Sequence, residues 1–333
     1  MRVLAGDIGG TKTLVAIAEV SEQAGSLQID VLASRRYESH RFPGLAAVCH
    51  AFAADVALPL PKSAGFGVAG PVVNGRSQAT NLAWVLDEAD LARALGLESV
   101  RLVNDFVTLA LGIPAVKPED LSMLNEGVRV DGGPMAIIGA GTGLGEAIAL
   151  RAPGGALRVF PSEGGHSDFA PRNELEISVL RFLSTRFEHV SWERVLSGDG
   201  LVNLAEALAQ TGAAPLPPAV ALAVRDDRKS APAAVTDAAA AGDPVCRQAL
   251  QLFCSLYGAE AGNLALKTLP SGGVYVAGGI APRILAWLRD GRFRESFLAK
   301  GRMRPLLEHV PVQVVLNTDA GLLGAASLAA TRP

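Results

Sequence analysis

The sequence predicts an α/β protein built from two related domains, and two observations support this prediction. Runs rich in Val, Ile and Leu, which are typical of strands, alternate along the chain with segments whose apolar residues have helical spacing. A glycine-rich turn between two such strands occurs twice, as GDIGGTKT at 6–13 and as GAGTGLG at 139–145. Two copies of one strand-turn-strand unit favour a duplicated architecture over one large sheet. The 333 residues suffice for two domains that each bury a core.

Composition and charge narrow the class of protein. With 49% hydrophobic and 19% charged residues, the chain is typical of a globular protein. The net charge of -3 and the scattered Lys and Arg residues provide no basic surface for nucleic acid. The three cysteines cannot all pair and have no metal-ligand spacing, which favours a reducing compartment. No segment is typical of a secretion signal or a membrane span. We therefore expect a cytoplasmic protein that binds no nucleic acid and no membrane.

The first expected half begins with three adjacent strands, and the first glycine turn joins two of them. An apolar helix follows Pro43, and a second helix has an acidic start and a stop at Gly96. The strand that ends in Asn104 and Asp105 runs straight into a third helix. Strands are predicted at 2–7, 13–20, 27–37, 63–70 and 100–105, and helices at 43–56, 87–97 and 106–113.

The second expected half repeats the strand, glycine turn and strand, and then becomes mainly helical. An Ala- and Pro-rich interval at 211–235 is predicted to be a surface connection or a loose pair of helices. The apolar helix near the C-terminus is expected to return to the first domain. Strands are predicted at 135–150, interrupted by the turn, and at 156–162, 272–280 and 311–317, and helices at 173–187, 244–269 and 320–330.

The first glycine turn has the composition of a phosphate site but not the spacing of a P-loop. A P-loop requires glycine immediately before its lysine, and Thr11 stands before Lys12. Glycines in a hairpin still let amide N–H groups approach an anion. Thr11 could add a hydroxyl, and Asp7 could hold Mg²⁺ through water. The alternative is a plain tight turn with a solvated acid, while Lys12 could neutralise phosphate charge or simply face solvent.

The second glycine turn resembles a dinucleotide-binding sequence only superficially. Its glycines alternate and do not satisfy GxGxxG, and a strand rather than a helix is expected after them. Hydride transfer to a dinucleotide therefore has little support.

Six motifs, taken together and in order, resemble the bacterial glucokinases, which are ATP-dependent hexose kinases of the sugar kinase, Hsp70 and actin superfamily. The resemblance covers nearly the whole chain, and the absence of a cysteine-rich zinc motif places it nearer the zinc-free branch. The motifs are GDIGGTKT, LVNDF, GAGTGLG, PSEGGHSDFAP, ERVLSGDGLVNL and VAGGI.

This resemblance implies a fold and a domain division. It implies two actin-like (ribonuclease H-like) domains, each with a mixed central sheet flanked by helices, with a cleft between them. The small domain would comprise 1–115 plus about 307–333, and the large domain about 116–306. A homodimer is also implied.

The resemblance further implies transfer of the γ-phosphoryl group of ATP to the 6-hydroxyl of glucose, a glycolytic reaction that uses Mg²⁺. Asp105 would be the general base, although Asn104 or Asp105 could also act as a helix N-cap. Without the resemblance, Glu163 would read as a solvated loop carboxylate and His166 as a structural histidine. Sugar contacts are implied for Asn104, Asp105, Glu163, His166, Glu193 and Asn81. Nucleotide contacts are implied for Asp7, Gly9, Gly10, Thr11, Gly141, Thr142, Gly143, Gly278 and Gly279.

Two alternatives remain open from the sequence. One is a kinase for another hexose, such as mannose, fructose or an N-acetylated hexosamine. The other is a sugar-sensing binding protein with little catalysis, which would normally carry a DNA-binding helix-turn-helix that this sequence does not show before its first strand.

Overall fold

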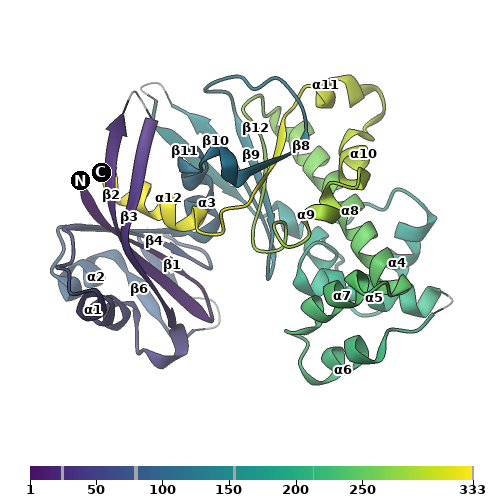
Figure 1. Cartoon of the computed structure of the whole chain (residues 1–333), viewed down its shortest axis with the longest axis horizontal. Helices are drawn as coiled ribbons and strands as arrows, with labels where there is room; N and C mark the ends of the chain where they lie inside the picture. The colour runs from purple at the N-terminus through teal and green to yellow at the C-terminus, as the bar shows by residue number, and fades with distance from the viewer. Residues whose placement is uncertain (24–25, 79–81, 153–154, 213, 332–333) are drawn as a thin grey trace. The chain divides into compact units, whose positions relative to one another are not determined.

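The computed structural model describes residues 1–23, 26–78, 82–152, 155–212 and 214–331 and divides the chain into two compact units (Figure 1). The first unit comprises Met1–Leu121, Ala156–Pro161 and Asn317–Pro333, and the second comprises Ser122–Gly155 and Ser162–Leu316.

The first unit contains a five-stranded mixed sheet in the order β3-β2-β1-β4-β7. β1 pairs antiparallel with β2 and parallel with β4, and β4 pairs parallel with β7. The three adjacent strands predicted at the start of the chain are therefore confirmed. The strands are β1 (Arg2–Ile8), β2 (Lys12–Gln23), β3 (Ser26–Glu38), β4 (Ser63–Val68) and β7 (Ser99–Asn104), and a separate two-stranded sheet contains β5 (Arg76–Gln78) and β6 (Val85–Asp87).

Helices cover both faces of this sheet because side chains along β1 alternate between two cores. Leu4 and Ile8 belong to a cluster that includes residues of α1 (Leu45–Val56) and α2 (Glu88–Leu95). Val3 and Ala5 belong to a second cluster with residues of α12 (Ala320–Ala330), which also packs on α3 (Asp105–Gly112). Asp7 shares the β1 face of Val3 and Ala5, so this alternation directs it toward α12. Short 3-10 helices follow at Ser39–Arg41, Ile113–Ala115 and Pro118–Asp120.

The second unit repeats the strand order of the first. Its sheet contains β10-β9-β12-β13-β8 in that order, with β9 and β10 antiparallel and with β12 parallel to both β9 and β13. The neighbouring strands β10, β9, β12 and β13 of this sheet thus correspond to β2, β1, β4 and β7 of the first sheet. This correspondence confirms the predicted duplication. The strands are β8 (Leu121–Asn125), β9 (Met135–Ala140), β10 (Leu144–Arg151), β12 (Gly273–Ala277) and β13 (Val312–Val315), and β11 (Leu157–Ser162) follows β10 in the chain.

The domain boundaries differ from the expected ones: the first unit runs to Leu121 rather than to 115 and also includes Ala156–Pro161. The placement of β13 moves the C-terminal boundary as well. β13 pairs with β12, with Val274 opposite Val312, so residues 312–315 are part of the second sheet. The C-terminal segment of the first unit consequently begins at Asn317 rather than at about 307.

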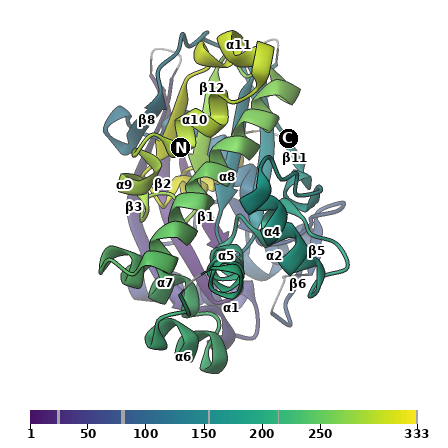
Figure 2. The same ribbon diagram turned by 90° about the vertical axis from the view of Figure 1, so that its right-hand side faces the viewer.

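A long helix, α8 (Pro244–Thr268), organises the helical part of the second unit. α5, α7 and α10 pack against it, and Figure 2 shows it crossing the unit. The interval at 211–235 contains α6 and the first part of α7, which corresponds to the helix-pair alternative. No helix in the described ranges is long and apolar enough to cross a bilayer. The other helices are α4 (Glu174–Ser184), α5 (Gly198–Thr211), α6 (Pro218–Asp226), α7 (Ala231–Ala240), α9 (Leu285–Leu288), α10 (Arg292–Leu298) and α11 (Arg304–Glu308), with 3-10 turns η4 (Gly164–His166), η5 (Trp192–Arg194) and η6 (Gly301–Met303).

Candidate active site

The first glycine turn, Gly9 to Thr11, is held closed from behind by Ser39. Gly9 N donates to Lys12 O at 3.0 Å, which closes the hairpin between β1 and β2. Ser39 N donates to Thr11 O at 2.9 Å, and Ser39 Oγ donates to Gly9 O at 3.0 Å. The carbonyl groups of Gly9 and Thr11 are therefore occupied, whereas the amide groups of Gly10 and Thr11 donate no hydrogen bond to any described residue. Such free amides suit an anionic ligand.

Asp7 lies beside this turn, in the same unit as Asp105. A Cβ atom placed on Gly321, at the start of α12, would lie 4.0 Å from Asp7 Cγ. Burial, and then the nearby Asp105 carboxylate, raise the pKa of Asp7 to about 6, although the Arg36 guanidinium opposes the shift. A buried carboxyl group whose pKa is raised by a neighbouring carboxylate is typical of a functional site.

Asp105 occupies the first position of α3, where β7 ends. The preceding residue, Asn104, caps the helix: its Oδ1 accepts from Phe106 N at 2.9 Å, and its Nδ2 donates to Gly70 O at 3.1 Å. Asp105 Oδ1 also accepts from Phe106 N at 2.9 Å. The capping role left open by the sequence thus belongs mainly to Asn104.

Burial also raises the pKa of Asp105, and hydrogen bonding from Phe106 N and from the Asn104 side chain only partly offsets this effect. A general base works best when its pKa approaches the working pH. The shift therefore makes the Asp105 carboxylate a stronger proton acceptor than an exposed aspartate.

Close backbone packing between α3 and α12 determines where Asp105 lies. A Cβ atom on Gly324 would come within 1.6 Å of Thr108 O, and one on Gly112 within 1.9 Å of Ala320 O. Only glycine permits such an approach. These two glycines therefore let α12 lie directly against the helix that begins with Asp105.

The second glycine turn, Gly141 to Gly143, is also closed by a backbone hydrogen bond, but this turn is one residue shorter than the first. Gly141 N donates to Gly143 O at 2.8 Å, and Gly198 N, at the start of α5, donates to Gly141 O at 2.8 Å. Gly278 is beside this turn: its φ is 84°, and an added Cβ would lie 2.6 Å from Ala140 O. The structure thus brings Gly278 next to the second turn. Thr142, between the two turn glycines, is exposed. Beyond its chain neighbours, no atom of the described residues lies within 4 Å of a Cβ placed on Gly279.

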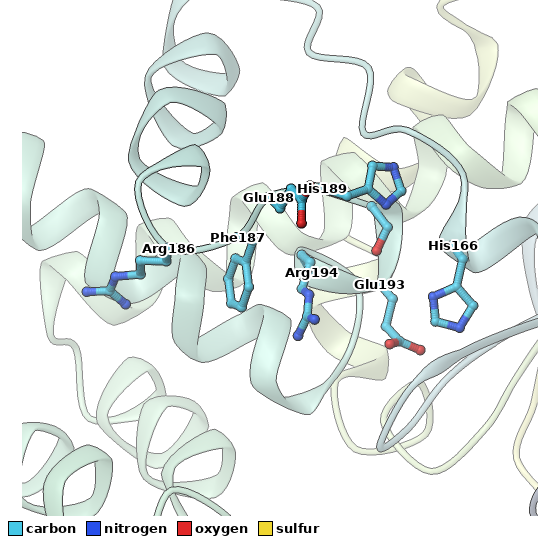
Figure 3. Close-up of a pocket in the computed structure, with 8 residues that line it drawn as sticks. His166, Arg186, Phe187, Glu188, His189, Glu193 and Arg194 are labelled. Carbon is cyan, nitrogen blue, oxygen red and sulfur yellow. The ribbon is translucent and has the colours of Figure 1, made fainter.

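The predicted sugar residues of the second unit lie on two short segments that pack together. Glu163 Oε2 is 3.9 Å from His166 Nε2 across the Gly164–His166 turn. The neighbouring segment brings in Glu193, whose Oε2 accepts from Leu144 N at 3.0 Å. His166 and Glu193 line one pocket, where Figure 3 shows the imidazole ring beside the carboxylate. Arg186 and Arg194 also line this pocket.

Sequence reasoning missed Ser39, and Asn81 stays a prediction because it lies outside the described residues. Ser39 is fully buried and distant in sequence from the turn that it holds. Nothing near Ser39 in the sequence indicates this role, because the contact depends on the pairing of β2 with β3, in which Lys12 lies opposite Glu38.

The structure contains a duplicated mixed sheet with a glycine hairpin turn at the same place in each copy. In the first copy, carboxylates lie near the ends of the strands. These features define an α/β phosphotransferase with the actin-like fold of sugar kinases. The comparisons with known proteins give the family.

The family model described as Glucokinase matches residues 4–332. A glucokinase from Nostoc sp. is 45% identical over 341 residues, which cover 98% of each chain. The solved glucokinase from an Antarctic psychrotroph superimposes with a TM-score of 0.86 at 29% identity and 98% coverage of each chain. A ROK family glucokinase from Streptomyces griseus, solved with glucose and AMPPNP, gives a TM-score of 0.67 at 25% identity and 99% coverage of each chain.

The chain belongs to the glucokinase family. The predicted resemblance, the fold and the class of enzyme, an ATP-dependent hexose phosphotransferase, are confirmed.

Proposed function

We propose that this chain transfers the γ-phosphoryl group of ATP to the 6-hydroxyl of glucose and that Asp105 is the general base. The observation that carries the proposal is the Asp105 carboxylate at the junction of β7 and α3, with its pKa raised by burial. The names of the relatives, and the glucose and AMPPNP in the Streptomyces griseus structure, support the choice of substrates.

In the proposed reaction, the 6-hydroxyl oxygen of glucose forms a bond to the γ-phosphorus, and the bond from that phosphorus to the β-phosphate oxygen breaks. The hydroxyl proton passes to the Asp105 carboxylate, and ADP leaves. The free amides of Gly10 and Thr11 donate hydrogen bonds to phosphate oxygens, with the glycines of the second turn and Gly278 and Gly279 as further nucleotide contacts.

Asp7 fits the role of an indirect Mg²⁺ ligand. Its carboxylate is the hard oxygen donor that Mg²⁺ prefers, and a nearby cation would relieve its repulsion with Asp105. Across the described residues, no cluster of three acidic, His or Cys side chains could hold a metal by itself. Asp7 would therefore act through water, with phosphate oxygens completing the shell. When bound, Mg²⁺ neutralises charge that develops on the transferred phosphoryl group.

Sugar hydroxyls both donate and accept hydrogen bonds, and Glu163, His166 and Glu193 match them. Glu193 is already oriented by Leu144 N, and His166 lies in the same pocket. We propose that these three residues bind hydroxyl groups of glucose and set the choice of sugar. The side-chain amide of Asn104 already accepts from Phe106 N through Oδ1 and donates to Gly70 O through Nδ2. A sugar contact of Asn104 would therefore use the second lone pair of Oδ1 or the second proton of Nδ2.

The substrate assignment is tested by an assay of ADP release across a panel of sugars with ATP and Mg²⁺. We expect glucose to give a higher kcat/KM than mannose, fructose and N-acetylglucosamine, because the proposed contacts of Glu163 and Glu193 would match the hydroxyl groups of glucose. A different preferred hexose would reassign the substrate. Sugar binding without turnover would instead identify a sensing protein.

Replacing Glu163 with Gln is expected to raise the KM for glucose by roughly 10-fold or more, because a charged acceptor contributes about 1.5–3 kcal/mol to a hydrogen bond. The kcat at saturating glucose should change much less, since Glu163 does not accept the transferred proton. The measurement is a glucose titration at saturating ATP. Glu174→Gln, an exposed acidic residue in the first turn of α4, is the matched control and should behave as wild type. An unchanged KM in Glu163→Gln would remove this residue from the sugar site.

A further inference from the structure

Two buried carboxyl groups, Glu146 on β10 and Glu260 on α8, meet in the interior of the second unit. Glu146 is 2% exposed and Glu260 is 0% exposed. The two side chains lie within hydrogen-bonding reach of each other. Neither residue has a part in the reaction described above, and buried acids are rarely retained without a partner.

Each of these carboxyl groups has a buried oxygen without a donor. Glu146 Oε1 and Glu260 Oε1 have no hydrogen-bond partner among the described residues. Glu260 Oε2 accepts from Asn263 Nδ2 at 2.8 Å, and Lys267 Nζ approaches Glu260 Oε1 only to 3.9 Å. Two ionised carboxylates can only accept hydrogen bonds, so they cannot satisfy each other. A single proton held between them provides the missing donor and removes their repulsion.

Glu146 also supports the turn that carries two of the proposed sugar residues. A Cβ atom on Gly164 would lie 2.0 Å from Glu146 Oε2, so the backbone of the turn rests directly on this carboxyl group. A Cβ on the next residue, Gly165, would lie 2.1 Å from Leu144 O, also on β10. Glu163 and His166 flank these two glycines. A displacement of the Glu146 carboxyl group is therefore transmitted to both.

We infer that Glu146 is a positioning residue for sugar binding: a proton that it shares with Glu260 keeps its carboxyl group under Gly164, and loss of this proton weakens the affinity for the sugar. The inference rests on the proposed function, because it takes Glu163 and His166 as sugar ligands.

The charged surroundings determine the direction of the pH effect. Burial, and then the Glu260 carboxylate, raise the pKa of Glu146 to about 7, while Lys267 opposes the shift. Burial also raises the pKa of Glu260, and Lys267 and Lys300 oppose it. Other titratable groups near the pair include Tyr257 on α8, and Glu163 and His166, which flank Gly164 and Gly165 on the turn. Arg172 and Glu176 act on Lys300.

Because the pKa of Glu146 is raised, the shared proton is present below about pH 7 and is lost as the pH rises through that value. Above it, both buried groups carry charge and repel each other. Sugar affinity should consequently fall on the alkaline side. Lys300, whose pKa burial lowers to about 8, loses its charge in the same direction and removes a cation from Glu260.

The test is a set of glucose titrations by calorimetry without nucleotide, together with steady-state KM and kcat, from about pH 6 to about pH 9. For the wild type we expect a constant Kd at the acid end and a weakening of up to about 10-fold per pH unit above the pKa. Glu146→Gln should bind at the acid end and lose most of this alkaline weakening, because its amide donates to Glu260 without titrating. Glu260→Gln should flatten the profile in the same way.

The controls separate positioning from simple stability. Glu295→Gln, an exposed residue of α10, should retain the wild-type profile. Glu146→Ala, which can neither donate nor support Gly164, should bind glucose weakly at every pH, with the change in KM and not in kcat. Thermal unfolding is recorded for each variant at each pH. An alkaline weakening in Glu146→Gln equal to that of the wild type would overturn the inference. Failure of the wild type to bind glucose at any pH would instead overturn the proposed function.

Discussion

Asp105→Asn is expected to lower kcat by about 10²- to 10⁴-fold, the range that a lost general base produces. The amide has nearly the same shape as the carboxylate, but it cannot accept the proton of the sugar hydroxyl. The local structure should survive, because Asn104 Oδ1 caps α3 independently and Thr108 Oγ1 donates to the Asp105 backbone carbonyl at 2.7 Å. Glucose binding should therefore change far less than turnover.

The measurement combines a coupled assay of ADP release with calorimetric binding of glucose. Asp90→Asn is the matched control, because Asp90 also lies in the first turn of a helix of the same unit, α2, and pairs there with Arg93. This control should retain wild-type kcat. A kcat of Asp105→Asn close to that of the wild type would refute the assignment of the base.

Gly324→Ala is expected to destabilise the first unit strongly and to lower activity with it. The added Cβ would lie 1.6 Å from Thr108 O and 2.7 Å from Gly112 N, which are backbone atoms that no side-chain rotation can move. α12 must then shift away from α3, the helix that begins with Asp105. Overpacking of this kind costs roughly 3 kcal/mol or more. For a unit of this size that cost lowers the Tm by about 6–12 °C.

Thermal unfolding monitored by circular dichroism measures this effect. Gly321→Ala, in the same helix, is the control, since its Cβ would meet nothing closer than Thr108 Oγ1 at 3.8 Å. Alanine is preferred to glycine inside a helix by up to about 1 kcal/mol, so this control should be as stable as the wild type or more stable. A Gly324→Ala protein with wild-type stability would show that the contact between α3 and α12 yields without cost.

The sequence predicted the features of the site that depend on neighbours along the chain. The glycine turns follow from local strand patterns, and the position of Asp105 follows from a strand that ends where a helix begins. The proximity of Glu163 and His166 follows from a tight turn that contains two glycines. Each of these features is encoded within a few residues, which is the range over which backbone preferences act.

The remaining features depend on contacts between distant segments. Ser39 reaches the first glycine turn through the pairing of β2 with β3, and Leu144 N orients Glu193 through the packing of two segments. Asp105 raises the pKa of Asp7 because the strand that contains Asp7, β1, and the strand that precedes Asp105, β7, belong to one sheet. Only β4 lies between these two strands. A sequence pattern contains no measure of these separations.

By itself, the sequence determined the duplicated strand-turn-strand plan, the glycines that allow it and the order of the motifs that indicate the family. The tertiary structure alone decided which polar groups face one another: Asp7 near Asp105, Ser39 behind the first turn, and Glu146 with Glu260 beneath the second unit's Gly164. The physical reason is that strand periodicity and turn preferences are local properties of the chain. Burial, charge coupling and the state of a shared proton depend instead on the register of the strands and on helix packing, which bring distant residues within a few ångströms.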